Sequence, residues 1–259
     1  MTPKELAIIA ALEAGKILRE SIGTITDDDI QNKLPFDFVT EVDRKCEKVI
    51  LSLIKNHYPD HEILAEESGP SIQKNSFRWI VDPLDGTTNF IHHVPHSGIS
   101  IALEKDNEII VGVVYDPYRD ELFYAEQGKG AYCNNKPIAV SKQKDLSRCL
   151  VATGFPFKNK ELLGRYWTVL SEIFMQVSGI RRMGAAALDL VYIACGRFDG
   201  FFELKLSPWD VAAATIIIRE AGGKITDFEG KDNHIFSGNV IASNSLIHDF
   251  ILATVQKIF

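Results

Sequence analysis

Two aspartates three residues apart, Asp82 and Asp85, are the side chains whose type and spacing best suit chemistry in this sequence. They follow a short apolar run that predicts a strand, and a strand that ends in a turn can direct both carboxylates into one cleft. Carboxylate and carbonyl oxygens are the ligands that Mg²⁺ prefers, so Asp82, Asp85 and the carbonyl of Leu84 predict a metal site. Asp, Pro and Gly also form turns for purely conformational reasons, and an ordinary turn is the alternative.

The two residues that follow, Gly86 and Thr87, indicate the start of a helix. The first backbone N–H groups of a helix have no partner within it, and they suit a phosphate group. A metal site and a phosphate site would then lie side by side. That combination is typical of an enzyme that hydrolyses a phosphate ester.

Three further acidic residues, Glu66, Asp210 and Asp43, extend the candidate ligand set. Glu66 and Glu67 follow an apolar run, and adjacent side chains of an extended chain point to opposite sides, so at most one of them faces a cleft. Asp210 and Asp43 stand three residues after a serine and a threonine, where an acid caps a helix whatever its function. For each of the three, a purely structural role is the alternative.

The basic residues, histidines and cysteines are weaker candidates. Arg181 and Arg182 suit a second anionic group, although we expect at least one of them to face solvent. His92 and His93 lack the i, i+4 spacing of a helical zinc site, and the four cysteines form no CxxC pair. The absence of GxSxG, P-loop and GxGxxG motifs excludes the commonest serine hydrolases, nucleoside triphosphatases and dinucleotide-binding enzymes.

The elements that must position these residues change in character along the chain. Apolar periodicity predicts a helix over residues 3–20 and another after Thr40, and β-branched runs between residues 63 and 132 predict a meander of antiparallel strands. Beyond residue 145, strand-like runs alternate with helical patterns over 161–177, 185–195, 209–221 and 245–257.

This change predicts two subdomains that form one catalytic unit. Residues 1–143 would form an α+β subdomain with an antiparallel sheet and most of the metal ligands. Residues 144–259 would form an α/β subdomain that supplies Asp210 and residues of the substrate pocket. We expect a cleft at their interface.

Charge and composition limit the partners. The chain has 259 residues and a formal net charge of −7, so its overall field makes nucleic acid an unlikely partner and requires local groups to hold any anionic substrate. No stretch approaches the roughly 20 apolar residues of a membrane span, and the N-terminus lacks the pattern of a signal peptide. The sequence predicts a soluble, cytoplasmic protein that binds no membrane.

Several of these segments together resemble the inositol monophosphatase family, in its bacterial and archaeal branch, along nearly the whole chain. The resemblance rests on four runs: Glu66-Glu67-Ser68, Asp82-Pro-Leu-Asp85-Gly-Thr87-Thr88-Asn89-Phe90, Arg181-Arg182-Met-Gly184, and Trp209-Asp210-Val-Ala-Ala-Ala with Glu220-Ala-Gly-Gly223 after it. It implies an α+β fold, a five-layered αβαβα sandwich. It also implies a homodimer with Mg²⁺-dependent, lithium-sensitive phosphomonoesterase activity.

The resemblance also implies a role for individual residues. Glu66, Asp82 and the Leu84 carbonyl would hold the first Mg²⁺, while Asp82, Asp85 and Asp210 would hold the second. A third, looser ion would use Glu66 and water. Gly86 and Thr87 would bind the phosphate, and Asp43 with Thr87 would help to activate the attacking water. The polyol pocket would be lined by Asp85, Ala186, Glu203 and Asp210. Lys33 would correspond to a lysine in a mobile loop of the active site.

Inositol-1-phosphate is the first expected substrate. Fructose-1,6-bisphosphatase activity in the same site is the nearest alternative, because Arg181 or Arg182 suits a second phosphate; nucleotides rank third. Some family members carry His-Cys where this chain has Ser207-Pro208, which leaves the substrate open. A different class of function is an interaction protein of the transcription machinery whose catalysis is incidental.

Overall fold

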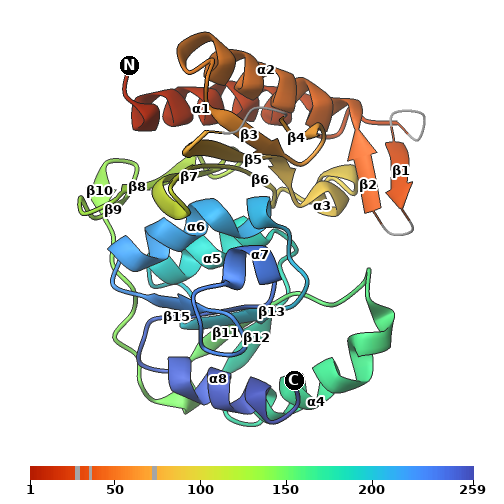
Figure 1. Ribbon diagram of the computed structural model, residues 1–259. Coiled ribbons are helices and arrows are strands. Elements are labelled where there is room, and N and C mark those ends of the chain that lie inside the picture. The colour runs from red at the N-terminus through yellow and green to blue at the C-terminus, as the bar shows by residue number, and fades with distance from the viewer. Residues whose placement is uncertain (27–29, 35–36, 72–74) are drawn as a thin grey trace.

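Five alternating layers of helices and sheets build the protein in the computed structural model, which describes residues 1–26, 30–34, 37–71 and 75–259 (Figure 1). From one end to the other, the layers are a helix pair, a large sheet, a second helix pair, a smaller sheet and a third helix pair. This is the αβαβα sandwich that the resemblance implied. In the part of the chain that the structure describes, no helix has the length and apolarity that crossing a bilayer requires.

The first layer consists of α1 (Pro3–Ser21) and α2 (Glu41–His57), which confirm the two helices predicted from periodicity. Both begin at a capping box, in which the N-cap threonine and an acid three residues later bond each other's backbone N–H groups. The apolar faces of the two helices pack on the large sheet. A short hairpin, β1 (Ile30–Leu34) and β2 (Asp37–Thr40), joins them.

The large sheet has the strand order β10-β9-β8-β7-β6-β5-β3-β4. The predicted antiparallel meander is confirmed for four of its strands: β5 (Phe77–Asp85), β6 (Gly98–Lys105), β7 (Glu108–Asp116) and β8 (Glu121–Glu126). The other strands are β3 (Glu62–Ala65), β4 (Gly69–Pro70), β9 (Ala131–Cys133) and β10 (Lys136–Pro137).

One pairing in this sheet differs from the expected meander, because β3 lies parallel to β5. Parallel strands bring their carboxyl ends to the same edge of a sheet. Glu66, which follows β3, donates its backbone N–H to Val81 O in β5 at 3.2 Å, and Asp82 is the next residue along. The parallel pairing therefore brings two candidate ligands of distant sequence together.

The middle helices, α5 (Ala186–Ala194) and α6 (Pro208–Glu220), lie between the two sheets. Every residue of α5 is buried, as its nearly continuous apolar sequence requires. The second sheet has the order β12-β11-β13-β15-β14: β12 (Gly179–Arg181), β11 (Leu150–Thr153), β13 (Gly200–Glu203), β15 (Val240–Ser243) and β14 (Lys224–Thr226).

The last layer consists of α4 (Leu163–Phe174) and α8 (His248–Gln256), which cover the far face of the second sheet. The four helices predicted beyond residue 145 are thus confirmed, three with shorter bounds and α6 shifted by one residue. Two short helices, α3 (Thr87–Ile91) and α7 (His234–Ser237), complete the fold. The division into subdomains at residue 143 stays a prediction.

Candidate metal centre

Three carboxylates, two buried and one half-buried, meet at one point from both sides of the predicted interface. Asp82 and Asp85 lie at the end of β5, and Asp210 lies in the first turn of α6. One oxygen from each lies within 4.8 Å of the other two. Asp82 and Asp85 are almost fully buried, which excludes the alternative interpretation that they form a solvent-exposed turn.

Backbone amides orient each of these carboxylates. Asp82 Oδ1 accepts a hydrogen bond from Leu84 N at 2.9 Å, and Asp210 Oδ2 accepts one from Ser207 N at 2.7 Å. Asp85 Oδ2 accepts from Ala187 N at 2.7 Å, in the first turn of α5. The Asp85 carboxylate thereby caps a helix that lies about a hundred residues further along the chain. These bonds orient the three side chains toward one another.

The electrostatics of the cluster fit a divalent cation. Burial, followed by the charges of Glu66, Asp85 and Asp210, raises the pKa of Asp82 well above its usual value. Burial also raises the pKa of Asp85 and of Asp210 to about 7. Like charges held together away from water are unfavourable unless an opposite charge joins them. A set of carboxylate and carbonyl oxygens suits a hard ion such as Mg²⁺.

We therefore expect the stabilisation that Mg²⁺ confers on the fold to increase with pH. In the folded, metal-free protein, Asp85 and Asp210 keep their protons up to about pH 7. In the unfolded chain, aspartates lose their protons near pH 4. The stability of the metal-free fold therefore falls as pH rises from about 4 to about 7. Metal binding requires the ionised form, and each displaced proton weakens the apparent affinity about tenfold per pH unit below pH 7.

The measurement is the difference in thermal midpoint with Mg²⁺ and with EDTA, between about pH 5 and about pH 8.5. Taking the difference removes the effect of other titrating groups, such as buried histidines. A difference of equal size at every pH would show that the carboxylates are already ionised and would contradict the prediction.

A second group of residues, beside the carboxylates, fits the water and phosphate roles that the resemblance implied. Gly86 has a φ of 89°, which glycine adopts without strain. It directly precedes the short helix α3. Thr87 Oγ1 lies 3.2 Å from Asp43 Oδ1 and 3.1 Å from Leu84 O. Burial raises the pKa of Asp43, which is fully buried and accepts from Thr40 N at 2.8 Å.

A small cavity opens next to the cluster, with a volume of about 120 Å³. Four carboxyl groups dominate its lining: Asp85, Asp189, Glu203 and Asp210. Ala186 lines it as well, which places all four predicted polyol residues in one cavity. Gly154 lies directly against Glu203, and a Cβ there would overlap the Glu203 carboxylate. Burial raises the pKa of Glu203 to about 8, and the nearby charge of Arg182 opposes this shift.

The remaining predicted residues have mixed placements. Glu66 is near enough to raise the pKa of Asp82 and Asp85, but it is outside the tight group of three. Both arginines are exposed; Arg182 lines the cavity, whereas Arg181 donates to the neighbouring Ile180 O at 3.1 Å. Lys33 was expected in a loop; its backbone belongs to strand β1, because Ile30–Leu34 pairs with β2. The side chain of Lys33 lies outside the described part of the structure.

The sequence analysis missed Asp189, Thr153 and Gly154, which all line the cavity. Asp189 stands within an apolar helical run, where a charged residue is unusual, and that was the available signal. Thr153 and Gly154 carried no such signal. His92 and His93 lie just after α3 and are exposed, as expected for loop histidines.

Known proteins are similar to this chain along almost its whole length. The model of the inositol monophosphatase family matches residues 4–259. The Nus factor SuhB of Escherichia coli (strain K12) is 42% identical over 252 residues, covering 97% of this chain and 94% of that protein.

Two solved structures are similar over almost their full length. The extragenic suppressor protein suhB from Bartonella henselae has a TM-score of 0.94 and 42% identity, covering 98% of each chain. An inositol monophosphatase from Anabaena has a TM-score of 0.89 and 38% identity, covering 99% of this chain and 96% of that one.

Proposed function

Because the chain belongs to the inositol monophosphatase family, we propose that it is a Mg²⁺-dependent phosphomonoesterase that hydrolyses inositol-1-phosphate to inositol and phosphate. The observation that carries this proposal is the group of three carboxylates, Asp82 and Asp85 buried and Asp210 half-buried, beside a cavity lined by further acids. Such a group is costly without a cation and is well suited to hold two or three of them. A homodimer, a cytoplasmic location and lithium sensitivity belong to the same proposal.

In this proposal the residues divide the work in the way the resemblance implied. Glu66, Asp82 and the Leu84 carbonyl would hold one Mg²⁺, and Asp82, Asp85 and Asp210 would hold another. When bound, Mg²⁺ would supply a lower pKa for the attacking water and positive charge opposite the phosphate oxygens. Phosphoryl transfer otherwise asks mainly for positioning.

The positioning falls to residues in and around the cluster. The Thr87 hydroxyl donates to Asp43, so its lone pairs can orient a water molecule, and Asp43 can take up the proton of that water through Thr87. The Gly86 and Thr87 amides bind the phosphate. Glu203 and Asp210 accept hydrogen bonds from the hydroxyl groups of the polyol, next to Ala186.

The first test is phosphate release from inositol-1-phosphate and from fructose-1,6-bisphosphate, measured side by side with and without Mg²⁺. A strong preference for the first, lost without metal, is the expected result. Comparable rates would indicate a dual-substrate sugar phosphatase. No release from either substrate would refute the phosphatase proposal.

A bisphosphate substrate is the second candidate because two cations stand near the acidic cavity. The Arg182 guanidinium lies over the Phe157 ring, 5.2 Å from its centroid, and lines the cavity. The charge of Lys158 acts to lower the pKa of Asp210, which places it close by. Either one suits a second phosphate group.

Arg182→Gln is therefore expected to lower the ratio of kcat/KM for fructose-1,6-bisphosphate to that for inositol-1-phosphate by about 10- to 100-fold, because a charged hydrogen bond contributes about 1.5–3 kcal/mol. Steady-state kinetics on both substrates measure the ratio. Arg181→Gln is the matched control, since Arg181 is adjacent, exposed and outside the cavity lining. An equal change in both variants would exclude a specific clamp at Arg182.

The names of relatives such as the Nus factor SuhB of Escherichia coli favour an additional role with the transcription machinery. Variants with a disabled metal centre separate the two roles. If the cellular role survives in such variants, catalysis is not needed for it. If the role is lost with the activity, the two are linked.

A further inference from the structure

Asp189 is a carboxyl group in the acidic cavity to which neither the metal cluster nor the family resemblance assigns a role. It lies in the first turn of α5 and is 2% exposed, and it lines the cavity together with Glu203. Among the described residues, no hydrogen-bond partner is present for Asp189 Oδ1. A buried oxygen without a partner costs about 1–3 kcal/mol, so it does not stabilise the fold by itself.

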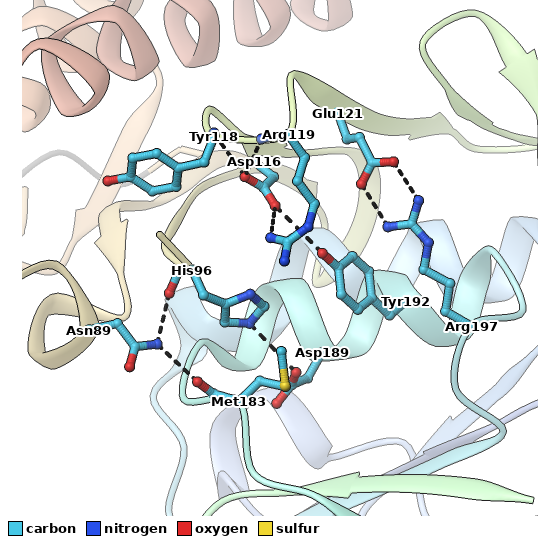
Figure 2. Close-up of polar contacts among 10 residues, drawn as sticks. All are labelled: Asn89, His96, Asp116, Tyr118, Arg119, Glu121, Met183, Asp189, Tyr192 and Arg197. Atoms are coloured by element: carbon cyan, nitrogen blue, oxygen red, sulfur yellow. Dashed lines mark hydrogen bonds and ion pairs between the residues drawn. The ribbon is translucent and has the colours of Figure 1, made fainter. Parts of the chain in front are cut away.

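His96 lies next to this carboxyl group (Figure 2). Its Nε2 is 3.9 Å from Asp189 Oδ1, and within the described chain neither ring nitrogen has a hydrogen-bond partner. Burial, together with the charge of Arg119, lowers the pKa of His96 to about 4. The ring is therefore neutral near pH 7, with one nitrogen that donates and one that accepts.

The position of His96 is fixed from two directions. Asn89 Nδ2 donates to His96 O at 2.8 Å and to Met183 O at 2.9 Å, which links the His96 loop to the cavity wall (Figure 2). The His96 ring meets the ring of Tyr192 edge-on, with centroids 6.1 Å apart. Tyr192 in turn donates to Asp116 Oδ2 at 3.5 Å. These contacts hold the His96 ring beside the Asp189 carboxyl group.

We propose that Asp189 determines substrate specificity by hydrogen-bonding a ring hydroxyl of the bound polyol phosphate, and that His96 is the positioning residue behind it. This inference rests on the proposed phosphomonoesterase function. A cavity with four carboxyl groups is rich in acceptors, and a polyol supplies the matching donors. A ring hydroxyl bound in the cavity would give the Asp189 carboxyl group a hydrogen-bond partner there. The site thereby selects a polyhydroxylated ring over a simple phosphate ester.

The first experiment compares inositol-1-phosphate with phenyl phosphate, which has no hydroxyl group. Asp189→Ala is expected to lower the ratio of kcat/KM for inositol-1-phosphate to that for phenyl phosphate by about 10- to 100-fold, mostly through KM, because a site built for a hydroxyl discriminates strongly. Asp189→Asn keeps the shape and a hydrogen-bonding group, and should restore most of the ratio. His96→Leu should lower the ratio less, and His96→Gln should restore it.

An equal loss on both substrates would assign Asp189 a merely structural role and would overturn the proposal, as would an unchanged ratio. A calorimetric titration with inositol-1-phosphate in Ca²⁺ tests binding without relying on Mg²⁺-dependent turnover, since Ca²⁺ accepts the same oxygen ligands. Binding about tenfold weaker or more in Asp189→Ala supports the proposal. Equal binding, or no binding by the unchanged protein, overturns it. Absent turnover with intact binding would refute only the phosphatase proposal.

Discussion

Asp82→Asn is expected to reduce kcat/KM for inositol-1-phosphate by about 10³-fold or more, because metal-centred charge stabilisation contributes several kcal/mol to phosphoryl transfer. Asparagine has nearly the same volume, and its carbonyl oxygen can still accept the Leu84 N–H bond that Asp82 Oδ1 accepts at 2.9 Å. The fold should therefore stay intact. Steady-state kinetics with saturating Mg²⁺, together with circular dichroism, measure both effects.

The same substitution should stabilise the metal-free protein. Burial, followed by the charges of Glu66, Asp85 and Asp210, raises the pKa of Asp82, so without metal its carboxyl group must either take up a proton or keep a repelled charge, and asparagine does neither. In EDTA near neutral pH, the thermal midpoint of Asp82→Asn should lie above that of the unchanged protein, and the gain from added Mg²⁺ should be smaller. Low activity with higher metal-free stability is a combination that simple misfolding does not produce.

Two further variants make this prediction sharper. Asp210→Asn should behave like Asp82→Asn, since Asp210 belongs to the same group of three carboxylates. Asp106→Asn is the matched control: Asp106 is exposed in the turn after β6 with a φ of 50°, a conformation that asparagine adopts equally well. Appreciable Mg²⁺-dependent activity in both cluster variants would refute the two-metal arrangement.

The parts of the site that the sequence predicted are local. The Thr40 and Asp43 capping box was visible as a threonine and an acid three residues apart, and the structure contains both of its bonds. Asp82 and Asp85 stood out because a strand runs directly into their turn, and β5 ends at Asp85. Periodicity and capping operate over a few residues, so a single sequence carries enough information for them.

The parts that were missed depend on long-range packing. Asp189 and His96 are 93 positions apart in sequence, and only the packing of α5 against the loop before β6 brings them together. Whether Arg181 or Arg182 lines the cavity depends on the direction in which each side chain points at the end of β12, which the sequence alone does not give. The parallel pairing of β3 with β5 likewise follows from sheet topology rather than from either strand's sequence.

Gly112→Ala is expected to destabilise the protein by about 3 kcal/mol, at the upper end for an overpacked core. Gly112 lies in β7 between Ala102 of β6 and Ala125 of β8, a row of small residues under α6. A Cβ at Gly112 would overlap the backbone carbonyl oxygen of Ala213, so α6 would have to move away from the sheet. Chemical unfolding measures the loss of stability.

The same substitution should also lower kcat/KM by about 100-fold, because α6 carries Asp210 and a displacement near 1 Å disrupts a catalytic site. Ala213→Gly should not rescue Gly112→Ala, since the overlap involves a backbone oxygen that every residue has. Gly164→Ala is the control: its Cβ would meet no atom within 4 Å in α4, so it should be neutral or stabilising by up to about 1 kcal/mol. Full stability and activity in Gly112→Ala would contradict the prediction. It would show that the close packing of α6 on the sheet at Gly112 does not determine the position of Asp210 beside Asp82.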